Sequence, residues 1–134
     1  MSRFAKKLVP VLSVAVLGGA SLASAGSSAD SAYCYKNTDG SGGCYGNFRG
    51  FRAHAGANTY AYFYKSDAGT RSFYGAYTNT TSGVTTYVSC TPDASTATLW
   101  TKALANEGYF SIYWNASGSC TSLYLANDSR YASY

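Results

Sequence analysis

The stretch Asn58–Tyr77 constrains the fold more than any other part of the chain. Its sequence, NTYAYFYKSDAGTRSFYGAY, contains two runs of strand-forming residues separated by a polar loop at residues 65–69. Two such runs around a glycine-containing loop are typical of a β-hairpin. Because side chains alternate along a strand, Tyr60, Tyr62 and Tyr64 are expected on one face and Ala61 and Phe63 on the other.

The turn predicts which residues of the second strand face these tyrosines. Closure with Lys65 opposite Thr70 would place Arg71 opposite Tyr64, Phe73 opposite Tyr62 and Gly75 opposite Tyr60. The hairpin would then carry a wall of aromatic rings with one cation beside it. Such a wall serves either as one inner face of a sandwich or as a surface for a partner.

The N-terminal residues have the features of a secretory signal peptide. A basic segment with Arg3, Lys6 and Lys7 precedes the apolar run 8–17, and Ala23-Ser24-Ala25 is a cleavage site of the A-x-A kind. The apolar run is too short for a stable membrane span. We therefore expect residues 1–25 to be a signal peptide, 26–32 a flexible leader and 33–134 a single domain, secreted to the extracellular space.

Removal of this segment changes the charge of the protein. The full chain has a formal net charge of +4, but cleavage leaves 10 − 3 = 7 basic residues against 6 acidic ones. A nucleic-acid or membrane-surface protein normally carries a basic stripe. No such stripe survives in the mature chain, so we expect neither nucleic acid nor membrane as a partner.

The composition of the mature part favours an all-β domain. Tyrosine is abundant, with 14 residues in the chain, and aromatic and β-branched side chains suit a pleated sheet. Short strand-like segments separated by turn residues predict a small antiparallel sandwich or barrel. We expect strands at 44–54, 84–90, 109–115 and 119–126. The ambiguous segment 94–105 is interpreted as a strand, with a short helix capped by Asp93 as the alternative.

The sequence contains four cysteines, all of them after the predicted signal peptide. An even number in a small exported chain indicates two disulfides, and we favour the pairs Cys34–Cys44 and Cys90–Cys120. A zinc site would need a different spacing, since the sequence has no C-x-x-C pair and one histidine. We expect neither a metal nor another cofactor.

Catalytic residues are scarce. His54 is the only histidine and Glu107 the only glutamate of the sequence. The chain is similar in composition to small guanyl-specific secreted ribonucleases, which use a glutamate base, an arginine and a histidine late in the chain. Here the histidine precedes the glutamate, and general acid–base catalysis needs both groups in one cleft. We predict a protein that is not an enzyme, with a ribonuclease-like activity as an alternative.

Binding is the function that the aromatic residues favour. Tyrosine offers a rigid contact surface with a polar tip and is enriched at interfaces. We predict that Tyr60, Tyr62, Tyr64 and Arg71 bind another secreted protein. A carbohydrate or cell-wall ligand stacked on exposed rings is the alternative, although Trp114, which alternates with Phe110 and Ile112, is expected to be buried.

In outline, the chain resembles a known family of secreted proteins. A signal peptide, a short cysteine loop and a compact domain rich in tyrosine and threonine also make up the adaptor subunit of actinobacterial umbrella toxin particles. The resemblance implies a non-catalytic adaptor that links a lectin-like subunit to a stalk protein. It rests on layout and on no diagnostic motif, so it assigns no residues. Small secreted protease inhibitors share this layout, and inhibition of a secreted enzyme is the second expectation.

Overall fold

The computed structural model describes residues 29–128, 130 and 131, and seven strands dominate this part of the chain. The predicted signal peptide lies outside the described residues. The all-β class predicted from the composition is confirmed. In chain order the elements are β1 (Ala32–Lys36), β2 (Gly42–Asn47), α1 (Phe48–Ala53), β3 (Tyr60–Lys65), β4 (Arg71–Thr78), β5 (Thr85–Pro92), α2 (Ala94–Ala97), α3 (Trp100–Leu104), β6 (Tyr109–Trp114) and β7 (Ser119–Ala126).

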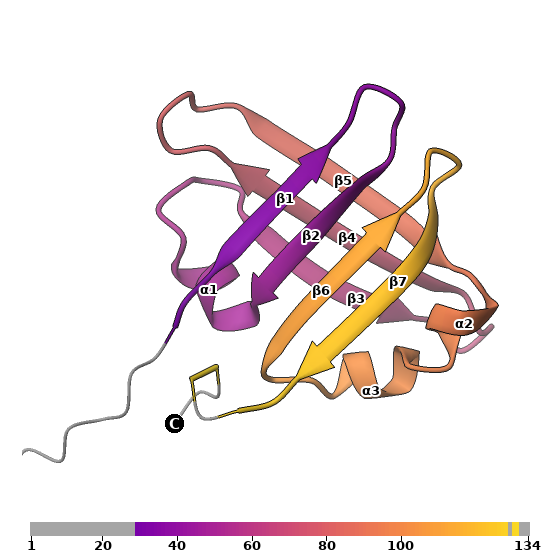
Figure 1. The fold of residues 1–134 in the computed structure, drawn as a ribbon. Helices are drawn as coiled ribbons and strands as arrows, with labels where there is room; N and C mark the ends of the chain where they lie inside the picture. The colour runs from indigo at the N-terminus through magenta and orange to yellow at the C-terminus, as the bar shows by residue number, and fades with distance from the viewer. Residues whose placement is uncertain (1–28, 129, 132–134) are drawn as a thin grey trace, which may run out of the picture.

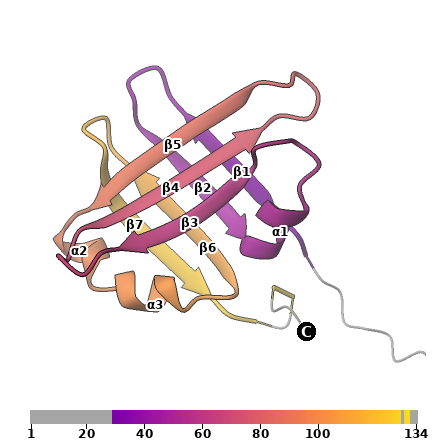
Figure 2. The same cartoon turned by 180° about the vertical axis from the view of Figure 1, so that it is seen from behind.

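The strands form one sheet in the order β1-β2-β6-β7-β5-β4-β3, and this sheet folds into two layers. One layer holds β1, β2, β6 and β7, and the other holds β3, β4 and β5, whose strands cross those of the first (Figures 1 and 2). Neighbouring strands are antiparallel except at the junction of the layers. There β5 and β7 run parallel and pair only at Thr91–Ser119 and Pro92–Cys120.

Phenylalanine and tryptophan side chains fill the space between the layers. Phe63 and Phe73, which face each other across β3 and β4, meet Phe110 of β6 with ring centroids 5.4 and 5.7 Å away. Trp100 of α3 adds an edge-on contact with Phe63 at 5.2 Å. Trp114 is 4% exposed, so its predicted burial is confirmed.

Both predicted disulfides are present. Cys34 and Cys44 lie opposite each other in the β1–β2 ladder, so their bond closes a hairpin. Cys90 and Cys120 connect β5 to β7 and therefore join the two layers close to their short parallel junction. All four cysteines are buried.

The hairpin of residues 58–77 forms, but its predicted register is wrong by one residue. Lys65 pairs with Arg71, and Tyr64, Tyr62 and Tyr60 pair with Ser72, Tyr74 and Ala76. The reason is the turn, in which the main chain of Ser66 bonds to Thr70 and Gly69 adopts a φ of 85°. Because side chains alternate along a strand, this shift moves Arg71 and Phe73 to the face opposite the tyrosines.

The predicted strand over 44–54 is also wrong, because β2 ends at Asn47 and α1 follows. The Asn47 side chain accepts a hydrogen bond from the Gly50 amide at 3.0 Å and so caps the helix. It also accepts from the Ser31 amide at 3.1 Å and donates to the Ala29 carbonyl at 3.2 Å. The fully buried Asn47 thus fixes residues 29–31, the segment before β1, against the start of α1.

Residues 94–105 contain α2 and α3, so the predicted strand is wrong and the helical alternative with an Asp93 cap is confirmed. The Asp93 carboxylate accepts from the Thr96 amide at 2.8 Å. In α3, Trp100 and Ala103 are the buried residues. None of the helices in the described part of the chain has the length and apolar character that a membrane crossing needs.

Candidate binding surface

Tyrosine differs from the other aromatic residues of this fold in its exposure to solvent. Every tyrosine in the described part of the chain is at least partly exposed, whereas both tryptophans and most of the phenylalanines there are buried. A buried phenolic hydroxyl needs a hydrogen-bond partner, so phenylalanine is the better filler of an apolar core. The sequence leaves open whether the tyrosine wall of the hairpin is core or surface, and the structure places it on the surface.

Five tyrosines share the outer side of the β3-β4-β5 layer, which we call the tyrosine face. The exposed fractions of the three side chains on β3 are 42%, 47% and 44%, and those of Tyr74 on β4 and Tyr87 on β5 are 38% and 60%. The alternation of β3 puts its tyrosines outward because Phe63 points into the core. The face consists of Tyr60, Tyr62, Tyr64, Tyr74 and Tyr87.

The rings of the tyrosine face stack on one another. Tyr60 and Tyr62 have centroids 6.0 Å apart with their planes at 28°, and Tyr62 and Tyr74 have centroids 5.2 Å apart with planes at 27°. These are offset-stacked arrangements in which ring faces meet. Ala76, which lies opposite Tyr60 and Tyr87 in the ladder, is completely covered.

Arg71 does not belong to this surface. The register places it beside Lys65 on the other side of the β3-β4 ladder, and its guanidinium Nε is buried with no hydrogen-bond partner among the described residues. The structure therefore brings together the three predicted tyrosines but separates the predicted cation from them. Sequence reasoning missed Tyr74 and Tyr87, which the corrected register and the pairing with β5 add to the surface.

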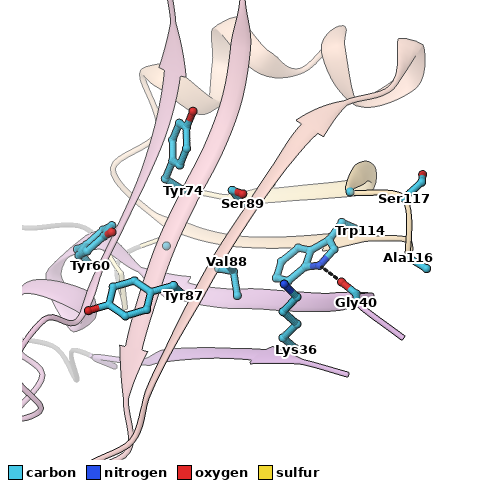
Figure 3. A pocket seen from close by; sticks show the side chains of 12 residues that line it. Lys36, Gly40, Tyr60, Tyr74, Tyr87, Val88, Ser89, Trp114, Ala116 and Ser117 are labelled. Atoms are coloured by element: carbon cyan, nitrogen blue, oxygen red, sulfur yellow. Dashed lines mark hydrogen bonds between the residues drawn. The ribbon is translucent and has the colours of Figure 1, made fainter. Parts of the chain in front are cut away.

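A pocket of about 470 Å³ adjoins the tyrosine face (Figure 3). Tyr60, Tyr74 and Tyr87 line one side of it, and the tips of the β1–β2 and β6–β7 hairpins line the other. Trp114 also lines the pocket, and its indole Nε1 donates a 3.1 Å hydrogen bond to the carbonyl of Gly40 in the β1–β2 turn. This bond holds the β1–β2 turn against the end of β6. The pocket is thus bounded by a fixed turn and by β5.

A second tyrosine cluster joins the two layers, with Tyr33 on β1, Tyr45 on β2 and Tyr77 on β4. Tyr33 contacts Tyr45 and Tyr77 with centroid separations of 5.5 and 5.0 Å. Burial raises the pKa of Tyr45, and the neighbouring phenols, Tyr33 first among them, add to this effect. This cluster is more packed than the tyrosine face.

His54 is not among the residues that line the pocket of Glu107, the other residue of the ribonuclease-like alternative. His54 contacts the Tyr77 ring at 4.9 Å, and its Nδ1 accepts a 3.0 Å hydrogen bond from the Gly56 amide. Glu107 lines a separate pocket together with Arg49 and Arg52. In the described part of the chain no group of three or more His, Cys, Asp or Glu side chains is placed to hold a metal ion.

Comparisons with protein-family models, with curated proteins and with solved structures found no match to this chain.

Proposed function

We propose that the protein is a secreted, non-catalytic binding module that engages another secreted protein through the tyrosine face. Its role would be that of an adaptor subunit in a secreted toxin-type complex, or of an inhibitor of a secreted enzyme. The observation that carries the proposal is the set of five exposed tyrosines on one face of a disulfide-bonded domain. Tyrosine supplies a large contact area with few rotatable bonds and is enriched at protein interfaces.

The ring geometry favours a protein over a carbohydrate. A sugar stacks on an aromatic face that is open to solvent, but Tyr60, Tyr62 and Tyr74 cover one another's faces. Ring edges and hydroxyl groups are what such a stack offers to a partner. These groups suit the mixed apolar and hydrogen-bonding contacts of a protein interface.

Secretion is supported by the signal-like N-terminal sequence and by the two disulfides, since such bonds persist in oxidising compartments. A non-catalytic role is supported by the lining of the Glu107 pocket, which does not include His54, because acid–base catalysis needs both groups in one cleft.

The test is capture of a partner by the protein purified from the culture medium after export. The immobilised protein is incubated with culture supernatant, and a polysaccharide resin is run in parallel. Tyr87→Ser and the double variant Tyr62→Ser/Tyr74→Ser should lose the captured protein. Tyr124→Ser is the matched control, because Tyr124 lies on the other layer and is as exposed as Tyr87, both at 60%.

Retention on the polysaccharide without any captured protein would replace the proposal by the carbohydrate alternative. Equal loss of capture in Tyr124→Ser would show that the tyrosine face is not the binding surface. Ribonuclease activity that disappears in His54→Ala or Glu107→Gln would refute the non-catalytic role.

A further inference from the structure

Strand β5 has one main-chain edge to which no other strand is hydrogen-bonded over residues 85–89. On one side it pairs with β4 from Thr85 to Cys90. On the other side it pairs with β7 only at Thr91 and Pro92, where the two layers join. The segment 85–89 therefore has an edge without a ladder partner, and three of its residues, Tyr87, Val88 and Ser89, line the 470 Å³ pocket.

The hydrogen bonds of the junction show which groups point to the side without a ladder partner. The amides of Thr91 and Asp93 donate to the carbonyls of Gly118 and Cys120 at 3.0 and 3.1 Å, on the β7 side. Main-chain groups alternate along a strand, so the N–H and C=O groups of Tyr87 and Ser89 point to this same side. Within the described residues, no main-chain or side-chain partner bonds to them there.

This edge lacks the devices that normally prevent strand addition. Protein edges are usually protected by lysine, proline, a bulge or a covering helix. The segment 85–89 reads Thr-Thr-Tyr-Val-Ser, with no charge, proline or glycine.

The charge of the pocket adds a second requirement. Lys36 is the only charged side chain among the residues that line it, and it forms no ion pair within the described part of the chain. A ligand that carries a carboxylate would complement this ammonium group. The lining thus combines two free N–H and C=O pairs, three tyrosines and one cation.

From these observations we infer that the pocket accepts an extended polypeptide segment, which adds to β5 along residues 85–89 and places a carboxylate beside Lys36. The main chain of the segment would bond to Tyr87 and Ser89, and its outward side chains would lie beside the Tyr87 ring. Strand addition of this kind draws affinity from main-chain bonds and specificity from alternate side chains. The inference rests on the proposed function, since it names what part of the protein partner enters beside the tyrosine face.

The test uses a displayed library of random eight-residue peptides, selected against the exported full-length protein. Selected peptides should be enriched in Asp or Glu at one fixed position. On binding, they should slow hydrogen exchange of the Tyr87 and Ser89 amides, measured by NMR. The Val88 amide, which points to β4, is the internal control and should change little.

Two chemical variants make the result specific. N-methylation of the peptide at the two amides facing β5 should weaken binding roughly fivefold to tenfold each, since each removes one hydrogen bond, whereas N-methylation at the intervening amides should not. Lys36→Gln should weaken binding about twofold to fivefold, as expected for a solvent-exposed ion pair. Lys102→Gln on the exposed side of α3 is the control and should have no effect.

Failure of this inference can be told apart from failure of the proposed function. A selection that yields no peptides, or peptides that leave the Tyr87 and Ser89 amides unprotected, overturns strand addition. If a partner is nevertheless captured through the tyrosine face, the proposed function stands without it. Peptides that bind equally well to Lys36→Gln refute the carboxylate requirement.

Discussion

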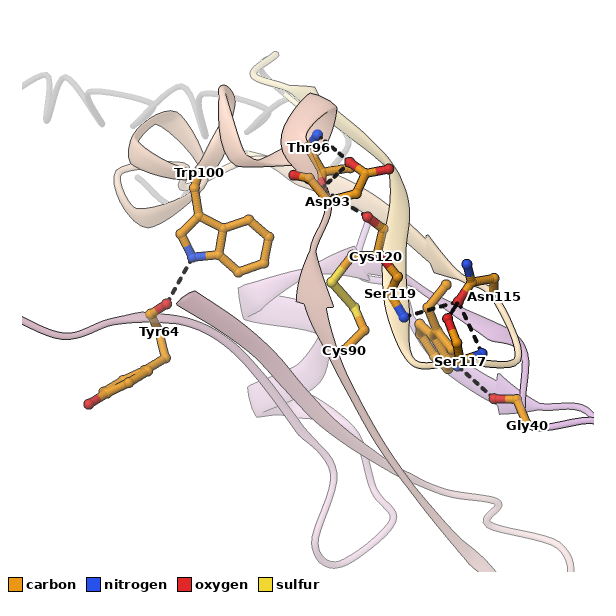
Figure 4. The surroundings of a disulfide bond; sticks show 11 residues. Gly40, Tyr64, Cys90, Asp93, Thr96, Trp100, Asn115, Ser117, Ser119 and Cys120 are labelled. Carbon is orange, nitrogen blue, oxygen red and sulfur yellow. Dashed lines mark hydrogen bonds between the residues drawn. A yellow bond between two sulfur atoms is a disulfide. The ribbon is translucent and has the colours of Figure 1, made fainter. Parts of the chain in front are cut away.

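The indole Nε1 of Trp100 donates a 2.8 Å hydrogen bond to the main-chain carbonyl of Tyr64, at the end of β3 (Figure 4). Trp100 is fully buried, and its ring meets Phe63 edge-on. β3 is an edge strand of the sheet and pairs with another strand on one side only. The short helix α3 therefore fixes the strand that supplies three of the five rings of the tyrosine face.

Replacement of Trp100 by phenylalanine should lower the free energy of unfolding by about 1–3 kcal/mol. The substitution removes the hydrogen bond from the indole to the Tyr64 carbonyl and opens a small void. Urea denaturation measures the loss, and Leu104→Ala on the exposed side of the same helix should change stability by less than about 0.5 kcal/mol. Equal effects of the two substitutions would contradict the role given to the indole.

The two disulfides should differ in what they contribute. Cys34–Cys44 spans a sequence separation of 10 and Cys90–Cys120 one of 30. In the chain-entropy model both contribute roughly 2–4 kcal/mol, and the longer loop contributes about 1 kcal/mol more. Cys90→Ala/Cys120→Ala should therefore be less stable than Cys34→Ala/Cys44→Ala in guanidinium denaturation. The reverse order would mean that packing, not loop closure, sets the difference.

Gly75 is coupled to the first disulfide. A Cβ at this position would lie 3.1 Å from a methyl carbon of Val88, 3.3 Å from the Cys44 sulfur and 3.4 Å from the Cys34 sulfur. Gly75→Ala should thus cost about 1–3 kcal/mol through overpacking.

A double-mutant cycle separates this contact from the general effect of alanine in a strand. In the Cys34→Ala/Cys44→Ala background both sulfurs are gone, so the cost of Gly75→Ala should fall by at least about 0.5 kcal/mol. An unchanged cost, measured by the same denaturation experiment, would show that the two sulfurs do not contribute to the effect.

The parts of the fold that follow from local alternation could be predicted from the sequence. Tyr60, Tyr62 and Tyr64 share a face because the strand period is two, and Phe63 is inward for the same reason. The partner strand could not be aligned in this way. Its register depends on the turn, in which Gly69 has a positive φ. The loop between the two strands is one residue longer than predicted, so Arg71 and Phe73 lie on the face opposite the predicted one.

The helices and the β5 edge depend on contacts that are distant in sequence. Threonines at 96, 98 and 101 favour a strand, but the Asp93 cap and the burial of Trp100 against Phe63 outweigh that preference. The edge of β5 without a ladder partner arises from its short parallel pairing with β7. A local pattern contains no information on such a pairing, so Tyr87 and the pocket could not be assigned to the site beforehand.

The Asp93 cap should make stability depend on pH in the acidic range. Its carboxylate accepts from the amide and the hydroxyl of Thr96 (Figure 4). It also accepts from the Ser95 hydroxyl. The Thr96 amide is the largest cause that holds the pKa of Asp93 below its ordinary value of 3.8, and the Ser95 hydroxyl follows. Because the folded-state pKa is lowered, the stabilisation is fully present above the ordinary value and is lost as the pH falls through the lowered one.

Thermal melts of the wild type and of Asp93→Asn, from about pH 2 to about pH 6, test this expectation. The wild type should have the higher Tm at the upper end, and the two curves should converge at the acidic end, where both caps are uncharged. Ser95→Ala removes one donor and should raise the pKa of Asp93 part of the way back, so its curve should fall by less and level off at a higher pH than that of the wild type. A constant offset between wild type and Asp93→Asn over the whole range would show that the cap acts through its shape and not through its charge.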